Sequence, residues 1–133
     1  MLMVLPENKQ KTDKNRSYLE SFQFAFEGIR FAFKQERNLR FHFFTLIIIS
    51  LAGWFFSISR MEWLVLILTF ALVILMEMAN TIAEWTIDLI TNHQYHIIAK
   101  YVKDVAAGAV LIATIFAVII GAIIFIPKIL EWL

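Results

Sequence analysis

The chain has 133 residues, of which 60% are hydrophobic and 17% charged, whereas soluble domains average about 45–50% and about 25%. Its net charge is +1, and acidic residues interleave with the basic ones, so the sequence lacks the basic stripe of a nucleic-acid-binding protein. It has no cysteine, which excludes disulfides, thiol nucleophiles and iron–sulfur clusters, and the composition indicates a small integral membrane protein.

The N-terminal part carries most of the charge, because eight of the 12 Lys and Arg residues precede Phe41. Residues 1–16 show little apolar periodicity and predict a flexible tail. From Ser17 onward, apolar side chains recur at steps of three or four residues, at Phe22, Phe26, Ile29 and Phe33. This spacing predicts an amphipathic helix over about 17–36, lying in the membrane interface or against other helices.

Three apolar segments follow, at 41–59, 63–90 and 105–126, and each is expected to cross the membrane. We expect a tight turn at 59–62, a longer polar loop at 91–96 and an end to the last helix at Pro127. Eight Lys and Arg residues precede the first segment, only Arg60 lies between the first and second, and Lys100 and Lys103 lie between the second and third. By the positive-inside rule, the N-terminus and that loop are predicted to be cytoplasmic.

Polar side chains interrupt the second apolar segment at intervals of three and four residues, at Glu77, Asn80, Glu84 and Asp88. This spacing predicts one polar stripe on one helix face. A charged side chain at membrane depth costs about 2.5–3.5 kcal/mol, so a function is expected for Glu77. Glu84 and Asp88 fit equally well as solvated residues at a helix end.

Two further charged clusters are expected at the same membrane surface. Lys100, Lys103 and Asp104 precede the third segment, and the run 36–42 joins the amphipathic helix to the first segment. Each cluster alone is explained by the charged flank of a membrane span. Their convergence with Glu84 suggests a shared site.

Such a site has the groups needed for phosphoryl transfer to a lipid alcohol. Glu36 and Glu84 could hold Mg²⁺ with phosphate and water, and Lys103 could neutralise phosphate charge. Glu77 could accept the proton of the alcohol. The sequence has no phosphate-binding GxxxxGK[ST] loop and no protein-kinase motif. The histidines at 42, 93 and 96 have no metal-binding spacing and are expected at the interface or in a loop.

Three motifs in this order resemble the prokaryotic diacylglycerol kinase family, which includes the undecaprenol kinases of Gram-positive bacteria. The motifs are Glu36-Arg37-Asn38, Glu77-Met78-Ala79-Asn80-Thr81-Ile82-Ala83-Glu84 followed by Asp88, and Lys103-Asp104-Val105-Ala106-Ala107-Gly108. The likeness runs from about Ser17 to Pro127. It implies a homotrimeric lipid kinase of the bacterial cell membrane, with a surface helix, three spans, and ATP and Mg²⁺ at composite sites between subunits.

The resemblance also implies roles for individual residues. Glu77 matches the proton acceptor, Glu36 and Glu84 match the metal ligands, and Arg37 and Asn38 fall where the family meets its lipid. Positions associated with the nucleotide are Ser17, Phe24, Asn80, His96, Lys103 and Asp104. The family usually has Ala-Ile before the second metal-binding glutamate, whereas Ile82-Ala83 exchanges small and large side chains here.

The motifs are closer to the undecaprenol kinase branch, so undecaprenol is the expected acceptor and diacylglycerol the alternative. A proton- or cation-coupled transporter is an alternative of a different class, because an intramembrane glutamate such as Glu77 also suits it. A transporter would not need Glu84, Lys103 and Asp104 at the membrane surface. A non-catalytic scaffold subunit is a third alternative, and it would tolerate the loss of both Glu36 and Glu77.

Overall fold

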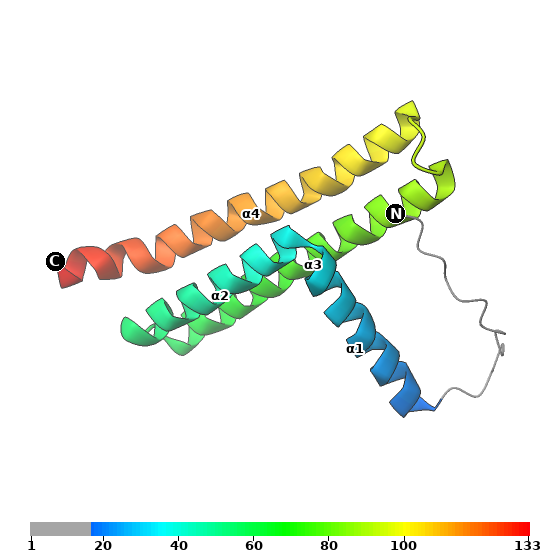
Figure 1. The fold of residues 1–133 in the computed structure, drawn as a ribbon. Helices are drawn as coiled ribbons and strands as arrows, with labels where there is room; N and C mark the ends of the chain where they lie inside the picture. Colours follow the sequence, from blue (N-terminus) through cyan, green and yellow to red (C-terminus); the bar gives the residue numbers. More distant parts are fainter. Residues whose placement is uncertain (1–16) are drawn as a thin grey trace. The chain divides into compact units, whose positions relative to one another are not determined.

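The computed structural model describes residues 17–133, and the predicted tail at 1–16 lies outside the described residues. Within the described part the chain is all-helical, without strands (Figure 1). The helices are α1 (Tyr18–Gln35), α2 (Arg37–Phe55), α3 (Arg60–Thr91) and α4 (Ile97–Trp132). The last three are long and apolar enough to cross a membrane, which confirms the predicted all-α membrane fold.

The chain divides after Phe31 into two compact units. Within the first, the hydroxyl of Ser17 accepts a hydrogen bond of 3.3 Å from the backbone N–H of Glu20. Ser17 therefore satisfies one of the free amides in the first turn of α1. The predicted amphipathic helix is present, and its position at the membrane surface stays a prediction.

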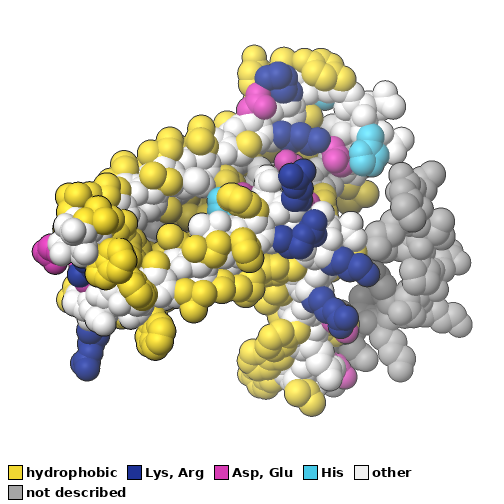
Figure 2. Space-filling view, turned by 60° about the vertical axis from the view of Figure 1, so that its left-hand side comes forward, with side chains coloured by type: hydrophobic (Ala, Val, Ile, Leu, Met, Phe, Trp, Pro, Cys, Tyr) yellow, Lys and Arg dark blue, Asp and Glu magenta, His cyan; other side chains and the backbone are white. Residues whose placement is uncertain are grey.

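In the second unit, α3 packs against both α2 and α4. The tightest apolar cluster lies near the α2–α3 turn, where Ile58 and Leu66 meet Ile124 and Phe125 of α4. Elsewhere hydrophobic side chains cover much of the long helices, and most charged side chains gather toward the helix ends (Figure 2). Such an exterior suits lipid or other membrane helices.

The end of α1 that belongs to the second unit is fastened to α2. The guanidinium of Arg40 donates to the carbonyls of Phe33 and Lys34, at 2.9 and 2.8 Å. These carbonyls have no partner further along α1 because the helix ends there. Leu39 is fully buried beside this junction. The chain direction around Glu36, the one residue between α1 and α2, is thereby fixed.

The turn expected at 59–62 was wrong, because α3 already begins at Arg60. The hydroxyl of Ser59 accepts from the N–H of Glu62 at 3.2 Å, and the carboxylate of Glu62 accepts from the N–H of Ser59 at 2.7 Å. This capping box satisfies two free amides at a helix start. The connection instead lies at 56–59, three residues earlier in the chain.

The expected limits of the last helix, 105 and Pro127, were also wrong. Helix α4 starts eight residues earlier at Ile97, where the imidazole Nδ1 of His96 accepts from the N–H of Ile98 at 3.1 Å. It continues through Pro127 to Trp132. Proline removes only one N–H from the helix, and membrane helices tolerate that loss. Lys100, Lys103 and Asp104 consequently lie inside α4.

Gly53 of α2 allows the close approach of α3. A Cβ atom added at Gly53 would lie 2.9 Å from the Trp63 ring and 3.0 Å from Ile58. We expect Gly53→Ala to destabilise the protein by about 1–3 kcal/mol through overpacking. Thermal unfolding in detergent, followed by circular dichroism, measures the effect. Gly121→Ala is the control, since its Cβ would meet nothing within 4 Å. Equal unfolding temperatures for the two variants would contradict the close contact.

Candidate active site

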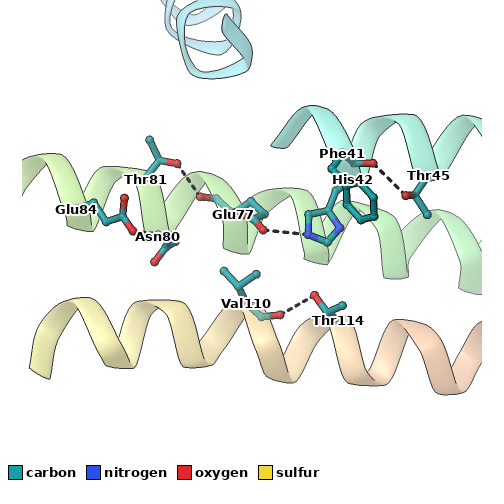
Figure 3. A network of polar contacts seen from close by, with 9 residues as sticks. All are labelled: Phe41, His42, Thr45, Glu77, Asn80, Thr81, Glu84, Val110 and Thr114. Carbon is teal, nitrogen blue, oxygen red and sulfur yellow. Dashed lines mark hydrogen bonds and ion pairs between the residues drawn. The ribbon is translucent and has the colours of Figure 1, made fainter. Parts of the chain in front are cut away.

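The most deeply buried carboxylate of the described chain belongs to Glu77, which is 4% exposed in the middle of α3. The imidazole Nε2 of His42, on α2, lies 3.0 Å from its Oε1 atom (Figure 3). The backbone carbonyl of Glu77 accepts from the hydroxyl of Thr81 at 3.1 Å. The carboxylate is therefore held at the contact between two membrane-spanning helices.

One turn further along α3, Asn80 and Glu84 interact with each other. The amide Nδ2 of Asn80 donates to the carboxylate Oε1 of Glu84 at 3.3 Å. The other amide atom, Asn80 Oδ1, is buried and has no hydrogen-bond partner within residues 17–133. An unpaired buried acceptor costs about 1–3 kcal/mol. Its presence beside a carboxylate indicates a place for a cation or a donor group.

Glu36 lies close enough to this stripe to respond to its charge. Burial raises the pKa of Glu36, and the negative charges of Glu84 and Glu77 raise it further, whereas Arg40 opposes the shift. The structure thus brings Glu36, Glu77 and Glu84 into one region of negative potential. No group of three or more His, Asp or Glu side chains in the described part is arranged to hold a metal ion unaided. A cation here would need ligands from elsewhere.

A second polar region surrounds the α3–α4 loop, where an open pocket of about 340 Å³ lies between the two helices. Its charged and imidazole-bearing lining residues are Asp88, His93, His96, Lys100, Lys103 and Asp104. The ammonium of Lys103 is hydrogen-bonded to Asp88, and that of Lys100 to Asp104 at 2.6 Å. Lys103 and Asp104, predicted together, therefore have separate partners, and each ammonium keeps further N–H donors for a ligand.

The remaining predicted positions lie at the start of α2, at the start of α4 and in the first unit. Arg37 and Asn38 are exposed in the first turn of α2. The Nδ1 atom of His96 caps α4, which leaves the Nε2 atom of its exposed ring for other contacts. Ser17 and Phe24 lie in the first unit, where Ser17 caps α1.

The sequence did not predict that His42 contacts Glu77. Its position depends on how α2 packs against α3, and neither helix encodes that register by spacing alone. One signal was present, because a titratable side chain inside a predicted apolar span is itself unusual.

Residues 23–125 match the family described as "Prokaryotic diacylglycerol kinase". The chain is 41% identical over 113 residues to a diacylglycerol kinase of Synechocystis sp. and 34% identical over 122 residues to an undecaprenol kinase of Bacillus subtilis. It is 26% identical over 116 residues to a diacylglycerol kinase of Haemophilus influenzae. These matches cover 85%, 92% and 86% of this chain. They cover 65% of the Synechocystis protein and 98% of each of the other two.

Burial of Glu36, together with the negative charges of Glu84 and Glu77, is expected to affect the stability of the folded chain. The raised pKa of Glu36 means that the folded chain holds this proton to higher pH than the unfolded chain. Stability is therefore lost as pH rises from the ordinary value of 4.5 through the raised one. We expect Glu36→Gln to unfold at a higher temperature than the parent at neutral pH without divalent cations. Below pH 4.5 the difference should vanish. A parent as stable as the variant at neutral pH would contradict the raised pKa of Glu36.

Proposed function

The chain belongs to the prokaryotic diacylglycerol kinase family and is a membrane lipid kinase with ATP as phosphate donor, and we propose that its acceptor is undecaprenol. The product would be undecaprenyl phosphate. The undecaprenol kinase of B. subtilis supports this acceptor, because its match extends over nearly the full length of both proteins. Family membership sets the transporter alternative aside. Diacylglycerol, which would give phosphatidic acid, is the competing acceptor.

The buried carboxylate of Glu77 is the observation that carries the mechanism. A lipid alcohol keeps its tail in the membrane and offers one hydroxyl, so its proton acceptor must lie within reach of the lipid. Glu77 meets this requirement, and it accepts the hydroxyl proton as the acceptor oxygen attacks the γ-phosphate. Replacement of this carboxylate by an amide tests the step, because phosphoryl transfer should then be lost.

An apolar groove of about 350 Å³ between α2 and α3 suits the acceptor tail. Phe43 and Leu46 of α2 and Phe70 and Ile74 of α3 contribute to its lining. Ile74 precedes Glu77 by one helical turn. A hydrocarbon chain in this groove would have its head group near the carboxylate. Arg37 and Asn38, exposed at the start of α2, would contact the head group from the membrane surface.

The nucleotide is proposed to bind at the α3–α4 loop, with Lys103 on its phosphates and Asp104 and His96 as further contacts. Lys103 would exchange or share its bond to Asp88 when phosphate arrives. Ser17 and Phe24 are proposed as further nucleotide contacts, as the family resemblance implies. The pocket is open, which suits a ligand that reaches from water toward the membrane.

The residues between these two regions fit Mg²⁺. Glu36 and Glu84 supply two carboxylates, and Asn80 Oδ1 supplies an oxygen acceptor without a partner among the described residues. Mg²⁺ is commonly bound by one or two carboxylates plus substrate phosphates and water, so a third carboxylate is not required. Bound there, Mg²⁺ would neutralise phosphate charge and orient the transferred group.

We further propose that the active sites are composite and form in a homotrimer in the bacterial cell membrane. One chain offers an open pocket and an open groove, so neighbouring subunits would supply the missing enclosure. The distribution of Lys and Arg favours a cytoplasmic N-terminus and a cytoplasmic α3–α4 loop, where ATP is available.

Transfer of labelled γ-phosphate from ATP in detergent tests the acceptor and the base together. We expect the parent to phosphorylate undecaprenol in preference to diacylglycerol, and Glu77→Gln to lose about 10²- to 10⁴-fold in kcat. Glu62→Gln, a carboxylate change at the far end of α3, is the matched control and should keep its activity. Undiminished transfer by Glu77→Gln would contradict the assigned base. A preference for diacylglycerol would contradict the assigned acceptor.

The metal proposal is tested by the Mg²⁺ dependence of the same reaction. Chelation should abolish transfer, and Mg²⁺ should restore it. Glu36→Gln and Glu84→Gln should each raise the Mg²⁺ concentration needed for half-maximal rate. We expect an increase of about 10- to 100-fold or more, because removing a side chain that only hydrogen-bonds to a metal ligand already weakens metal binding by that much. Glu62→Gln should not change it. An unchanged Mg²⁺ requirement in both site variants would remove these carboxylates from the metal site.

A further inference from the structure

His42 touches the proposed base, yet the mechanism above gives it no role. Its Nε2 atom lies 3.0 Å from Oε1 of Glu77, and the two side chains are 17% and 5% exposed. Within residues 17–133, it is the one basic side chain within ion-pair distance of this carboxylate. The contact therefore joins two polar groups in a largely apolar part of the helix pair.

No other described basic side chain is placed to donate to the Glu77 carboxylate. Glu36 and Glu84 are the other titratable groups near Glu77, and both are negative when ionised. Arg40 donates to backbone carbonyls at the end of α1. Helix α4, which packs against α3, has no titratable residue between Asp104 and Lys128. Among the described residues, the titratable donor in contact with the Glu77 carboxylate therefore comes from α2.

The direction of the contact follows from the chemistry of the base. An imidazole nitrogen and a carboxylate oxygen at this distance share one proton. Glu77 must begin the reaction ionised if it is to accept a proton. The shared proton therefore belongs to the imidazole in the reactive state, and Nε2–H donates to Oε1.

We propose that His42 is the positioning residue of the proton-accepting carboxylate, which it orients through its hydrogen bond to Oε1 so that Oε2 faces the acceptor hydroxyl. This inference rests on the proposed role of Glu77. The acceptor oxygen forms a bond to the γ-phosphorus, the bond from that phosphorus to the bridging oxygen of ADP breaks, and the hydroxyl proton moves to Oε2. His42 retains its own proton throughout and acts only through Glu77.

Two substitutions separate positioning from packing. Glutamine can place an amide N–H near the location of imidazole Nε2, whereas leucine has similar bulk and no donor. Thr45→Val is the matched control on α2, because the Thr45 hydroxyl donates only to the carbonyl of Phe41 in its own helix, at 3.0 Å (Figure 3). All three variants are prepared as the full chain in detergent.

Kinetics across a range of pH give the first readout. We expect His42→Leu to lower kcat by about 10- to 100-fold, the range for a hydrogen bond to a charged group, with the KM for ATP unchanged. The acid limb of its kcat profile should move to higher pH, because a carboxylate without a donor is protonated more readily. His42→Gln should keep the acid limb of the parent and a kcat within a few-fold. A His42→Leu variant with the kcat and profile of the parent would overturn the proposal. So would equal losses in both variants with unchanged acid limbs, since that result would show a packing role.

Infrared titration gives a second readout that needs neither ATP nor acceptor. The absorption band of the protonated Glu77 carboxyl is assigned by its loss in Glu77→Gln. We expect this band to appear at higher pH in His42→Leu than in the parent, with His42→Gln following the parent. Identical titration in all three proteins would overturn the positioning role even if the kinase reaction stands. A parent that transfers no phosphate, with the expected infrared difference, would instead count against the proposed function alone.

Discussion

Burial of the Glu77 carboxylate is the constraint on which the rest of the second unit depends. An ionised group at this depth costs about 2.5–3.5 kcal/mol on insertion scales, and the imidazole of His42 is the described group placed to offset that cost. The contact requires α2 to lie against α3 in one register. Arg40 fixes one end of α2 through the carbonyls of α1, and Gly53 allows the close approach at the other.

Polarity changes in steps along α3, and each step corresponds to one part of the proposed reaction. The first half of the helix borders an apolar groove, Glu77 follows at the end of that groove, and Asn80 and Glu84 come next. Asp88 lies about 16 Å beyond Glu77, at the pocket that contains Lys103. A lipid hydroxyl approaching from the membrane and a phosphate approaching from water would meet between these residues.

The helices and the polar stripe could be predicted because each depends on spacing within one segment. The pairing of Glu77 with His42 could not, because it depends on packing between segments. The spacing of Ser59 and Glu62 fits a capping box as well as a turn, and their polarity alone favoured the turn. The backbone geometry shows that they form a capping box at the start of α3. Pro127 was expected to end the last helix, but α4 continues past it. A helix of a membrane protein can continue past a proline that would end many soluble helices.

A structure of the full chain with Mg²⁺, a non-hydrolysable ATP analogue and undecaprenol tests the central claim most directly. The distance to measure joins the acceptor oxygen to the nearer carboxylate oxygen of Glu77. We predict a hydrogen-bonding separation of about 2.6–3.2 Å, with the γ-phosphate on the opposite side of the acceptor oxygen. An acceptor hydroxyl bound to another residue, with Glu77 directed away from it, would contradict the account.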